Sequence, residues 1–495
     1  MTRCTPLFVA LCLVLTSGCG GDEEVEPTDE TEACEATDSC DDDPEEGEEE
    51  EDNDPNRIGV QGDDCTTARD CAHNGACEGG LCVCHPPWHG ATCTTLEMGT
   101  VDKAVYGYRE GFPLTTSWGG SVQYDEASGL YIMLVSEYVE ECANWGWNST
   151  VVVATSEAPE GPYEKEFRLT GVMSHEAMLS RGPGGEWVVY FTASVFEGGL
   201  PANGDADYAD DQVCVRVSED APCECPGDPH KGSNDPTWMS MTATPLDRES
   251  WSEPVQIFDP ASHFTDTSKD GSPAESIDAN FNGVIEDDGS FVGLWRTWQC
   301  VEDLVEDKAE AYSRGSDACF SVPHAVRASD WEDPSTYVIA DKKRDLDWLF
   351  EAEYTVSPTE RLALGIEDPM VYRDSRSPGV YHAIFHEMFV PTDNVSHAYS
   401  EDGVTWTYTG PVFSADNPAN MPIVTFTDGT ETGLACERPQ LIVVDGVPTH
   451  IIIGGIPKGL NTDPAYPADA EPELLDQVEA TGWPGGATMV IPLVP

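Results

Sequence analysis

Short apolar segments with alternating polar positions fill the chain from about residue 96 to its C-terminus, and Gly, Pro, Asn and Asp punctuate them. Helical periodicity is scarce there, whereas strands of this length separated by turn residues are typical of all-β folds. The pattern therefore predicts one large all-β domain over residues 97–495.

One pattern recurs five times in this domain: a polar pair or triplet, an apolar strand, a Gly-containing turn and a second apolar strand. This composition predicts a β-hairpin. The copies span residues 119–137, 175–194, 280–297, 367–387 and 437–455. A second unit, with a strand, a Ser/Thr turn and Trp or Gly-Pro, follows at residues 151–163, 240–254, 324–334 and 397–411.

Five such units predict a five-bladed β-propeller, which closes on itself by radial repetition. The segment 487–494 would then complete or close the ring. An all-β sandwich is the alternative, but it would not need a polar pair at the start of every hairpin.

The first residues have the pattern of an export signal: a basic start with Arg3, an apolar run over residues 5–15, and then Leu-Thr-Ser-Gly-Cys ending at Cys19. The run is too short for a membrane-spanning helix. Residues 1–18 resemble a bacterial lipoprotein signal, which implies lipidation of Cys19, although Thr16 stands where an aliphatic residue is usual. We expect a protein of the bacterial cell envelope that touches membrane only through this anchor, or a secreted one if Cys19 is not lipidated.

Acidic residues dominate the next segment, residues 19–60, and Asp and Glu total 92 against 24 Lys and Arg in the whole chain. Such a segment buries too little apolar surface to fold, so we expect a disordered linker. The acids lack the glycine-centred spacing of a calcium loop. A net charge of −68 also argues against a nucleic-acid partner, which would require a basic surface.

Six cysteines fall within about thirty residues in the segment 61–96, which has turn glycines and no hydrophobic run. A unit this small needs disulfides, and six cysteines allow 15 pairings. The ending with Cys82, Cys84, Trp88, Gly90 and Cys93 resembles an EGF-like domain of the type that does not bind calcium. The resemblance implies the pairs Cys65–Cys77, Cys71–Cys82 and Cys84–Cys93. We favour a spacer role for this module, with adhesion as the alternative.

Seven further cysteines lie in the large domain: Cys142, Cys214, Cys223, Cys225, Cys300, Cys319 and Cys436. Three of them belong to a long insert over residues 201–236, and long loops in compact domains are often functional. In an exported protein the Cys-x-Cys pair of this insert is expected to form disulfides rather than to bind metal.

Candidate chemistry lies at the starts of the five hairpins, because the first strands of propeller blades line one channel and begin at one mouth. The polar sets there are residues 119–121, 174–176, 280–282, 367–369 and 437–439. Paired carboxyl groups at a concave site could act as the acid and base of glycoside hydrolysis, and tryptophans such as Trp118 could stack on sugars. The alternative is a structural role, in which each carboxylate pairs with an arginine.

The hairpins, the edge sequence Thr-Ser-Glu-Ala-Pro-Glu-Gly-Pro-Tyr and the Glu-Asp-Pro and Glu-Arg-Pro starts resemble glycoside hydrolase family 43 and its furanosidase relatives. The resemblance implies inverting hydrolysis, with Glu367 as the acid and Asp368 beside it. The first blade carries Gly119-Gly120-Ser121 where this family has its catalytic base. Either Glu176, Glu437 or, behind them, Glu137 supplies the base, or the domain binds sugar without cleaving it.

The expected partner is a carbohydrate polymer of the arabinose or xylose type. Candidate substrate-binding residues are His175, Asn280, Arg296, His386, Arg438 and Trp118. No cofactor is expected, although His175, His386 and His450 could border a central ion such as calcium.

Overall fold

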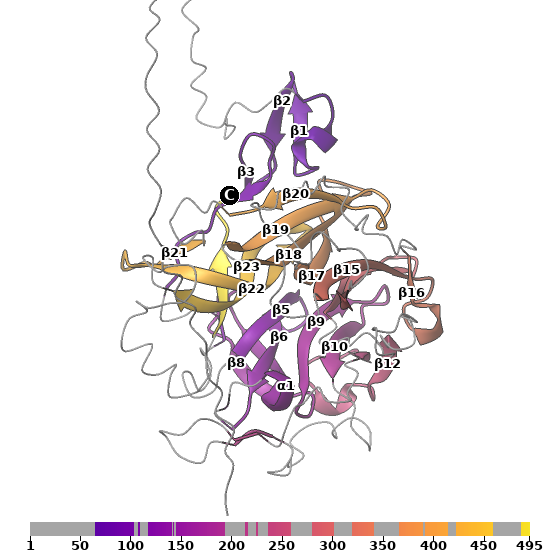
Figure 1. Ribbon diagram of the computed structural model, residues 1–495. Helices are drawn as coiled ribbons and strands as arrows, with labels where there is room; N and C mark the ends of the chain where they lie inside the picture. The colour runs from indigo at the N-terminus through magenta and orange to yellow at the C-terminus, as the bar shows by residue number, and fades with distance from the viewer. Residues whose placement is uncertain are drawn as a thin grey trace, which may run out of the picture. The chain divides into compact units, whose positions relative to one another are not determined.

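The computed structural model describes residues 65–102, 107–108, 117–140, 142, 145–193, 213–215, 224–225, 236–258, 280–300, 319–340, 366–389, 392–413, 422–458 and 487–495 (Figure 1). The signal segment, Cys19 and the acidic linker lie outside these residues, as does most of the insert at 201–236. No helix among the described residues is long and apolar enough to cross a membrane.

Five four-stranded antiparallel sheets form the large domain, which is a five-bladed β-propeller. Blade 1 contains β5 (Ser117–Asp125), β6 (Leu130–Tyr138), β7 (Ser149–Ser156) and β8 (Glu164–Arg168). Blade 2 contains β9 (Ser174–Arg181), β10 (Trp187–Ala193), β11 (Thr237–Thr242) and β12 (Val255–Phe258). Blade 3 contains β13 (Phe281–Ile285), β14 (Phe291–Cys300), β15 (Cys319–Ala328) and β16 (Val338–Ile339).

Blade 4 contains β17 (Ile366–Arg373), β18 (Tyr381–Phe389), β19 (Thr392–Ser400) and β20 (Thr407–Pro411). Blade 5 contains β21 (Ile423–Thr425), β22 (Glu431–Val444), β23 (Val447–Lys458) and β24 (Ala487–Pro492). Short helices join some strands: α1 (Trp145–Asn148), η2 (Arg248–Ser250) and η3 (Pro334–Thr336). Each of the five predicted hairpins is the pair of strands that begins at the channel, so the predicted architecture is confirmed.

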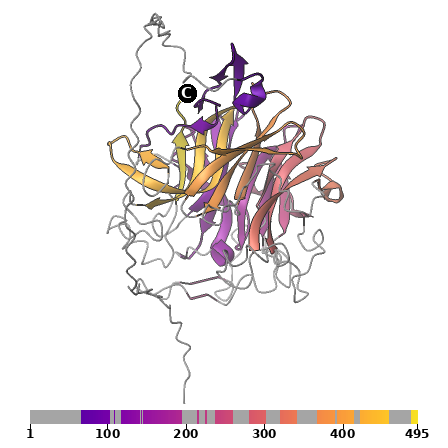
Figure 2. The same cartoon turned by 45° about the horizontal axis from the view of Figure 1, so that its top comes forward.

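The innermost strands β5, β9, β13, β17 and β22 contact one another in that cyclic order, and β22 returns to β5. The sheets follow the same order around the ring in Figure 1, from the purple strands of blade 1 to the yellow strands of blade 5. Figure 2 shows them from a tilted direction. The starts of these five strands therefore meet around one channel.

Apolar residues fill each space between neighbouring blades, because both faces of most strands are buried. Ile132 and Val153 of blade 1 pack with Leu179 and Val189 of blade 2, and similar clusters join every later pair of blades. The last cluster joins blade 5 back to blade 1 through Val490 of β24. Continuous burial of this kind makes the ring one hydrophobic unit.

Blade 5 is completed by residues that precede the first blade and by residues that follow β23. The last strand, β24, is an edge strand of blade 5 and pairs with β23, as the sequence predicts for a closing strand. Met98 pairs with Leu493 just beyond β24, and Val101 pairs with Phe426. The segment that leads into the propeller is thus fixed to the edge of the last blade.

The cysteine-rich module before the propeller has little regular structure: η1 (Ala68–Cys71), β1 (Gly75–Glu78), β2 (Leu81–Cys84), β3 (Trp88–His89) and β4 (Thr95–Leu96). Its disulfides join Cys65 to Cys77, Cys71 to Cys82 and Cys84 to Cys93, as the EGF-like resemblance implies. We call this segment the EGF-like module. In the insert, Cys214 and Cys225 form a further disulfide, and Cys142 is also disulfide-bonded.

Candidate functional site

The backbone adopts the left-handed conformation at the start of the inner strand in four of the five blades. The residues are Gly119, Glu176, Asp368 and Arg438, with φ angles of 66°, 57°, 52° and 49°. Each lies at a register shift between the first two strands of its hairpin. A bulge of this kind re-aims one side chain, and strained backbone is often found at functional sites.

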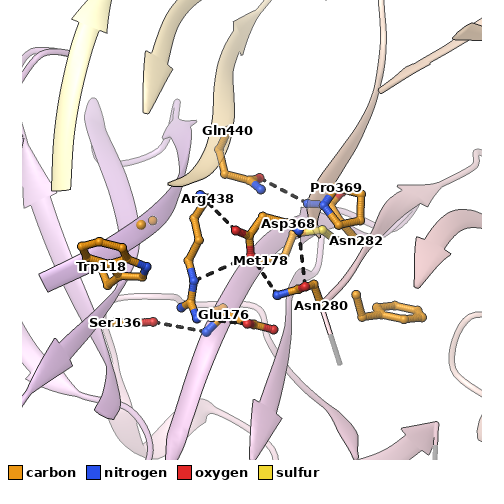
Figure 3. A pocket seen from close by; sticks show the side chains of 14 residues that line it. Trp118, Ser136, Glu176, Met178, Asn280, Asn282, Asp368, Pro369, Arg438 and Gln440 are labelled. Atoms are coloured by element: carbon orange, nitrogen blue, oxygen red, sulfur yellow. Dashed lines mark hydrogen bonds and ion pairs between the residues drawn. The ribbon is translucent and has the colours of Figure 1, made fainter. Parts of the chain in front are cut away.

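The re-aimed side chains meet in one cavity at the start of the channel (Figure 3). Glu176, Asp368 and Arg438 come from blades 2, 4 and 5, Asn280 comes from blade 3, and Trp118 comes from blade 1. The cavity has a volume of about 30 Å³. That volume holds about two water molecules, whereas pockets for small molecules usually have several hundred Å³.

Arg438 joins the two acidic sides of this cavity. Its Nη2 lies 3.0 Å from Glu176 Oε1, and its Nε lies 3.7 Å from Asp368 Oδ1. Its backbone N–H also donates to Asp368 Oδ2 at 3.1 Å. One guanidinium therefore compensates the negative charge of two carboxylates, and its several N–H donors allow it to bridge them.

Gly119 makes room for this arginine. A Cβ atom on Gly119 would lie 2.7 Å from Cβ of Arg438 and 2.9 Å from its Cδ. The first blade therefore has no space for the carboxylate that the family resemblance places there, because the stem of Arg438 fills that volume. The absence of an aspartate from blade 1 thus goes together with the arginine side chain that blade 5 places in the same space.

Both cavity carboxylates have additional donors. Asn280 Nδ2 donates to Asp368 Oδ1 at 2.8 Å, and Thr192 Oγ1 donates to Glu176 Oε2 at 3.2 Å. Hydrogen bonds to an ionised carboxylate favour the charged form. These contacts hold Glu176 and Asp368 in fixed positions as hydrogen-bond acceptors.

Glu367 forms a second cluster beside the cavity, with two other predicted residues. Its Oε2 accepts a hydrogen bond at 2.5 Å from Arg296 Nη2, and its Oε1 lies 3.2 Å from His386 Nδ1. His386 Nδ1 is also 4.0 Å from Asp368 Oδ2, which links the cluster to the cavity. Arg296 is only 2% exposed, so this ion pair is almost fully enclosed.

Ligand atoms of Glu367, Asp368 and His386 lie within 4.8 Å of one another, the spacing of a metal site. Arg296 and Arg438 already compensate the two carboxylates. Hard cations such as calcium take six or more oxygen ligands and need uncompensated carboxylates. The donor set therefore does not fit the central ion considered from the sequence, and His450 lies elsewhere, 3.3 Å from Glu160.

Besides the three members of this second cluster, two predicted site residues do not line the cavity. His175 is 1% exposed and its Nδ1 lies 3.3 Å from Ser149 Oγ of β7. Glu437 is half-buried in β22, opposite Gly454 of β23. Each directly precedes a left-handed residue, so each faces away from the side chain that follows it. Glu137, the remaining candidate base, pairs instead with Lys165 at 2.6 Å.

Several lining residues were not among the sequence predictions, including Ser136, Met178 and Gln440. Ser136 Oγ accepts from the backbone N–H of Glu176 at 3.2 Å, and Asn282 Nδ2 donates to Gln440 Oε1 at 3.2 Å. Gln440 and Asn282 stand two residues after Arg438 and Asn280, so strand alternation places them on the same face. That periodicity could have identified Gln440.

No model of a known protein family matches the sequence, and no curated protein matches it. Among solved structures it is similar to a family 117 glycoside hydrolase of Zobellia galactanivorans, with 10% identity and a TM-score of 0.41, over 81% of this chain and 90% of that one. It is also similar to an α-L-arabinofuranosidase of Podospora anserina, with 11% identity and a TM-score of 0.42, over 81% of this chain and 98% of that one. A family 43 enzyme of Xanthomonas citri has 11% identity and a TM-score of 0.39, over 81% of this chain and 91% of that one. The five-bladed architecture itself rests on the sheet order of this chain.

Proposed function

We propose that the propeller binds a neutral polysaccharide at the mouth of its channel and does not cleave it. The observation that carries this proposal is the position of the Arg438 guanidinium between Glu176 and Asp368. The guanidinium pairs with both carboxylates, whereas inverting hydrolysis needs a carboxylate that activates water.

The residue types at the mouth suit sugar hydroxyl groups. Planar carboxylate, amide and guanidinium groups of Glu176, Asp368, Asn280 and Arg438 offer fixed acceptors and donors, and Trp118 adds an apolar ring. Because the described cavity is small, hydroxyl groups enter it while the sugar ring stays at the mouth. A chain with a net charge of −68 favours an uncharged polymer over an anionic one.

The resemblance to furanosidase propellers points to arabinose- or xylose-type polymers. Two of the similar structures hold oligosaccharides: the Podospora enzyme holds cellotriose and the Xanthomonas enzyme holds xylotriose. This chain differs from the family pattern at Gly119, which stands where the resemblance places the base. Inverting hydrolysis needs one carboxylic acid that donates a proton and one free carboxylate that activates water.

Hydrolysis is the second candidate, because Glu367 retains the position that the resemblance assigns to the acid. Its carboxylate is 13% exposed and Asp368 is its neighbour. However, Arg296 and His386 both contact it, and an ion pair with a buried guanidinium favours the ionised form over the proton donor. The described geometry therefore supports binding better than cleavage.

We further propose that the protein is exported and held at the bacterial cell surface by a lipid on Cys19. The support is the lipoprotein-type signal at residues 1–18 and the disulfides of the exported type in the EGF-like module. The acidic residues 19–60 would then separate the folded part from the membrane.

Affinity electrophoresis in gels that contain arabinan, xylan or fructan tests the binding proposal. We expect at least one polymer to retard the wild-type protein, and Glu176→Gln to weaken the retardation by about tenfold or more, because it removes a charged acceptor. Asp288→Asn, in the exposed turn between β13 and β14, is the matched control and should bind like the wild type. Binding that is the same in Glu176→Gln and the wild type would place the sugar site elsewhere.

A further inference from the structure

The EGF-like module is docked directly on blade 4. The turn between β17 and β18 holds it at two points: the Arg376 guanidinium donates to the carbonyl oxygen of Pro86, and Ser377 Oγ donates to that of His73. Leu96 N–H donates to Val412 O at 2.7 Å on the edge of the same blade. These contacts fix the module against the propeller.

A buried pair of histidines lies under this contact. The ring of Trp88, from the module, lies 4.8 Å from the ring of His397 in β19, and His397 lies 5.4 Å from His382 in β18. Both histidines are 0% exposed. Tyr372 of β17 stacks on the other side of His382, at 5.4 Å. The module thus covers a short stack of rings in blade 4.

The hydrogen bonds determine which ring nitrogens of these two histidines carry a proton. Thr409 Oγ1 donates to the His397 carbonyl oxygen, so it accepts from His397 Nδ1 at 2.8 Å. His397 Nε2 is then an acceptor, and His382 Nδ1 donates to it at 3.1 Å. Both rings are neutral, and His382 Nε2 carries a buried lone pair that meets no donor among the described residues. An added proton would bind there.

Titratable and charged groups approach this pair from the module and from the turn between β17 and β18. The groups are His73 and His85 of the module, Asp374 and Arg376 of the β17–β18 turn, and, further along the same contact, Arg69 against Tyr399 and Glu401 against His73. Asp374 favours a proton on His382, but Arg376 and the two module histidines oppose it. Arg376 already holds Asp374, with Nη2 2.6 Å from Oδ2.

We propose that this contact is an acid-sensitive latch, in which protonation of the His382–His397 pair releases the EGF-like module from blade 4. The proposal does not depend on sugar binding by the propeller. A protonated His382 would compete with Arg376 for Asp374, and Arg376 is the side chain that holds Pro86 of the module.

The direction of the effect follows from the pKa values of the pair. Burial lowers the pKa of His382 from 6.5 to about 3, and burial also holds the pKa of His397 well below 6.5. A histidine whose pKa is lowered in the docked state stabilises docking fully above pH 6.5, and this contribution is lost as the pH falls towards 3.

Hydrogen exchange of the full chain at pH 7.5 and pH 5, corrected for intrinsic exchange rates, tests the latch. We expect peptides from residues 70–90 and 392–400 to exchange at least about fivefold faster at pH 5, while blade cores stay protected. The double variant His382→Phe/His397→Phe should lose most of this pH dependence. It replaces both hydrogen-bonding partners with apolar rings of similar shape, which is often nearly neutral for stability.

The matched control is His450→Phe, which removes another buried imidazole whose pKa burial lowers. It lies in blade 5, so it should leave the pH dependence of the module peptides unchanged. Arg376→Ala should loosen the module at both pH values without abolishing the fold. Wild-type module peptides that exchange equally at both pH values would overturn the proposal, as would a double variant that keeps the full pH response.

Discussion

At the scale of residues, the site depends on a contact between blade 1 and blade 5. Gly119 of blade 1 has no side chain, and the aliphatic part of the Arg438 side chain of blade 5 occupies the space beside it. The sequence predicts which positions meet, because every blade begins with a polar pair. It does not predict which residue of each pair faces the channel, because that depends on the bulge at Gly119, Glu176, Asp368 and Arg438. His175 and Glu437 are the residues whose direction could not be foreseen.

We expect Gly119→Ala to destabilise the propeller because the new Cβ atom would meet Arg438 at 2.7 Å and the residue has a φ of 66°. Overpacking and the left-handed conformation together cost about 2–4 kcal/mol. Gly129→Ala is the matched control, with a φ of 73° and open space around it. It should cost only about 1–2 kcal/mol. Urea unfolding measures both, and equal losses would show that Arg438 does not fill the space of Gly119.

At the scale of elements, the repeated hairpins were predictable because each carries its own alternating pattern and its own turn. The contribution of residues 98–101 to blade 5 was not predictable, because two isolated pairings, Met98 with Leu493 and Val101 with Phe426, make it. No local pattern encodes such long-range pairs. The predicted closing strand, β24, in contrast, is an apolar run that the sequence shows directly.

We expect Val490→Asp to prevent closure of the ring. Val490 is 0% exposed in β24 and packs among residues of blades 1 and 5. An unpaired charge there costs several kcal/mol, which is a large share of the stability of a domain. Val494→Asp is the control, because Val494 is only half-buried beyond the end of β24. Thermal unfolding with near-ultraviolet circular dichroism should show a native transition for Val494→Asp and its loss for Val490→Asp.

At the scale of the whole molecule, the resemblance to an EGF-like domain implied the disulfides of the EGF-like module, and the repeats predicted the propeller. The contact between the two was not foreseen. It consists of single residues, such as Trp88 and His397, whose patterns belong to separate domains. The hairpin repeats predicted that the blade starts meet at one channel mouth, but the ion pairs of Arg438 and Arg296 emerge only from the folded ring.

The most direct test of the account is prolonged incubation of the wild-type protein and Glu367→Gln with arabinan, xylan and fructan, followed by quantification of released reducing ends. The account predicts that the polymer retained in affinity electrophoresis is not cleaved, so that both proteins give the same signal as the blank. Release of sugar by the wild type that Glu367→Gln abolishes would contradict it, since Glu367 would then donate a proton despite its pairing with Arg296.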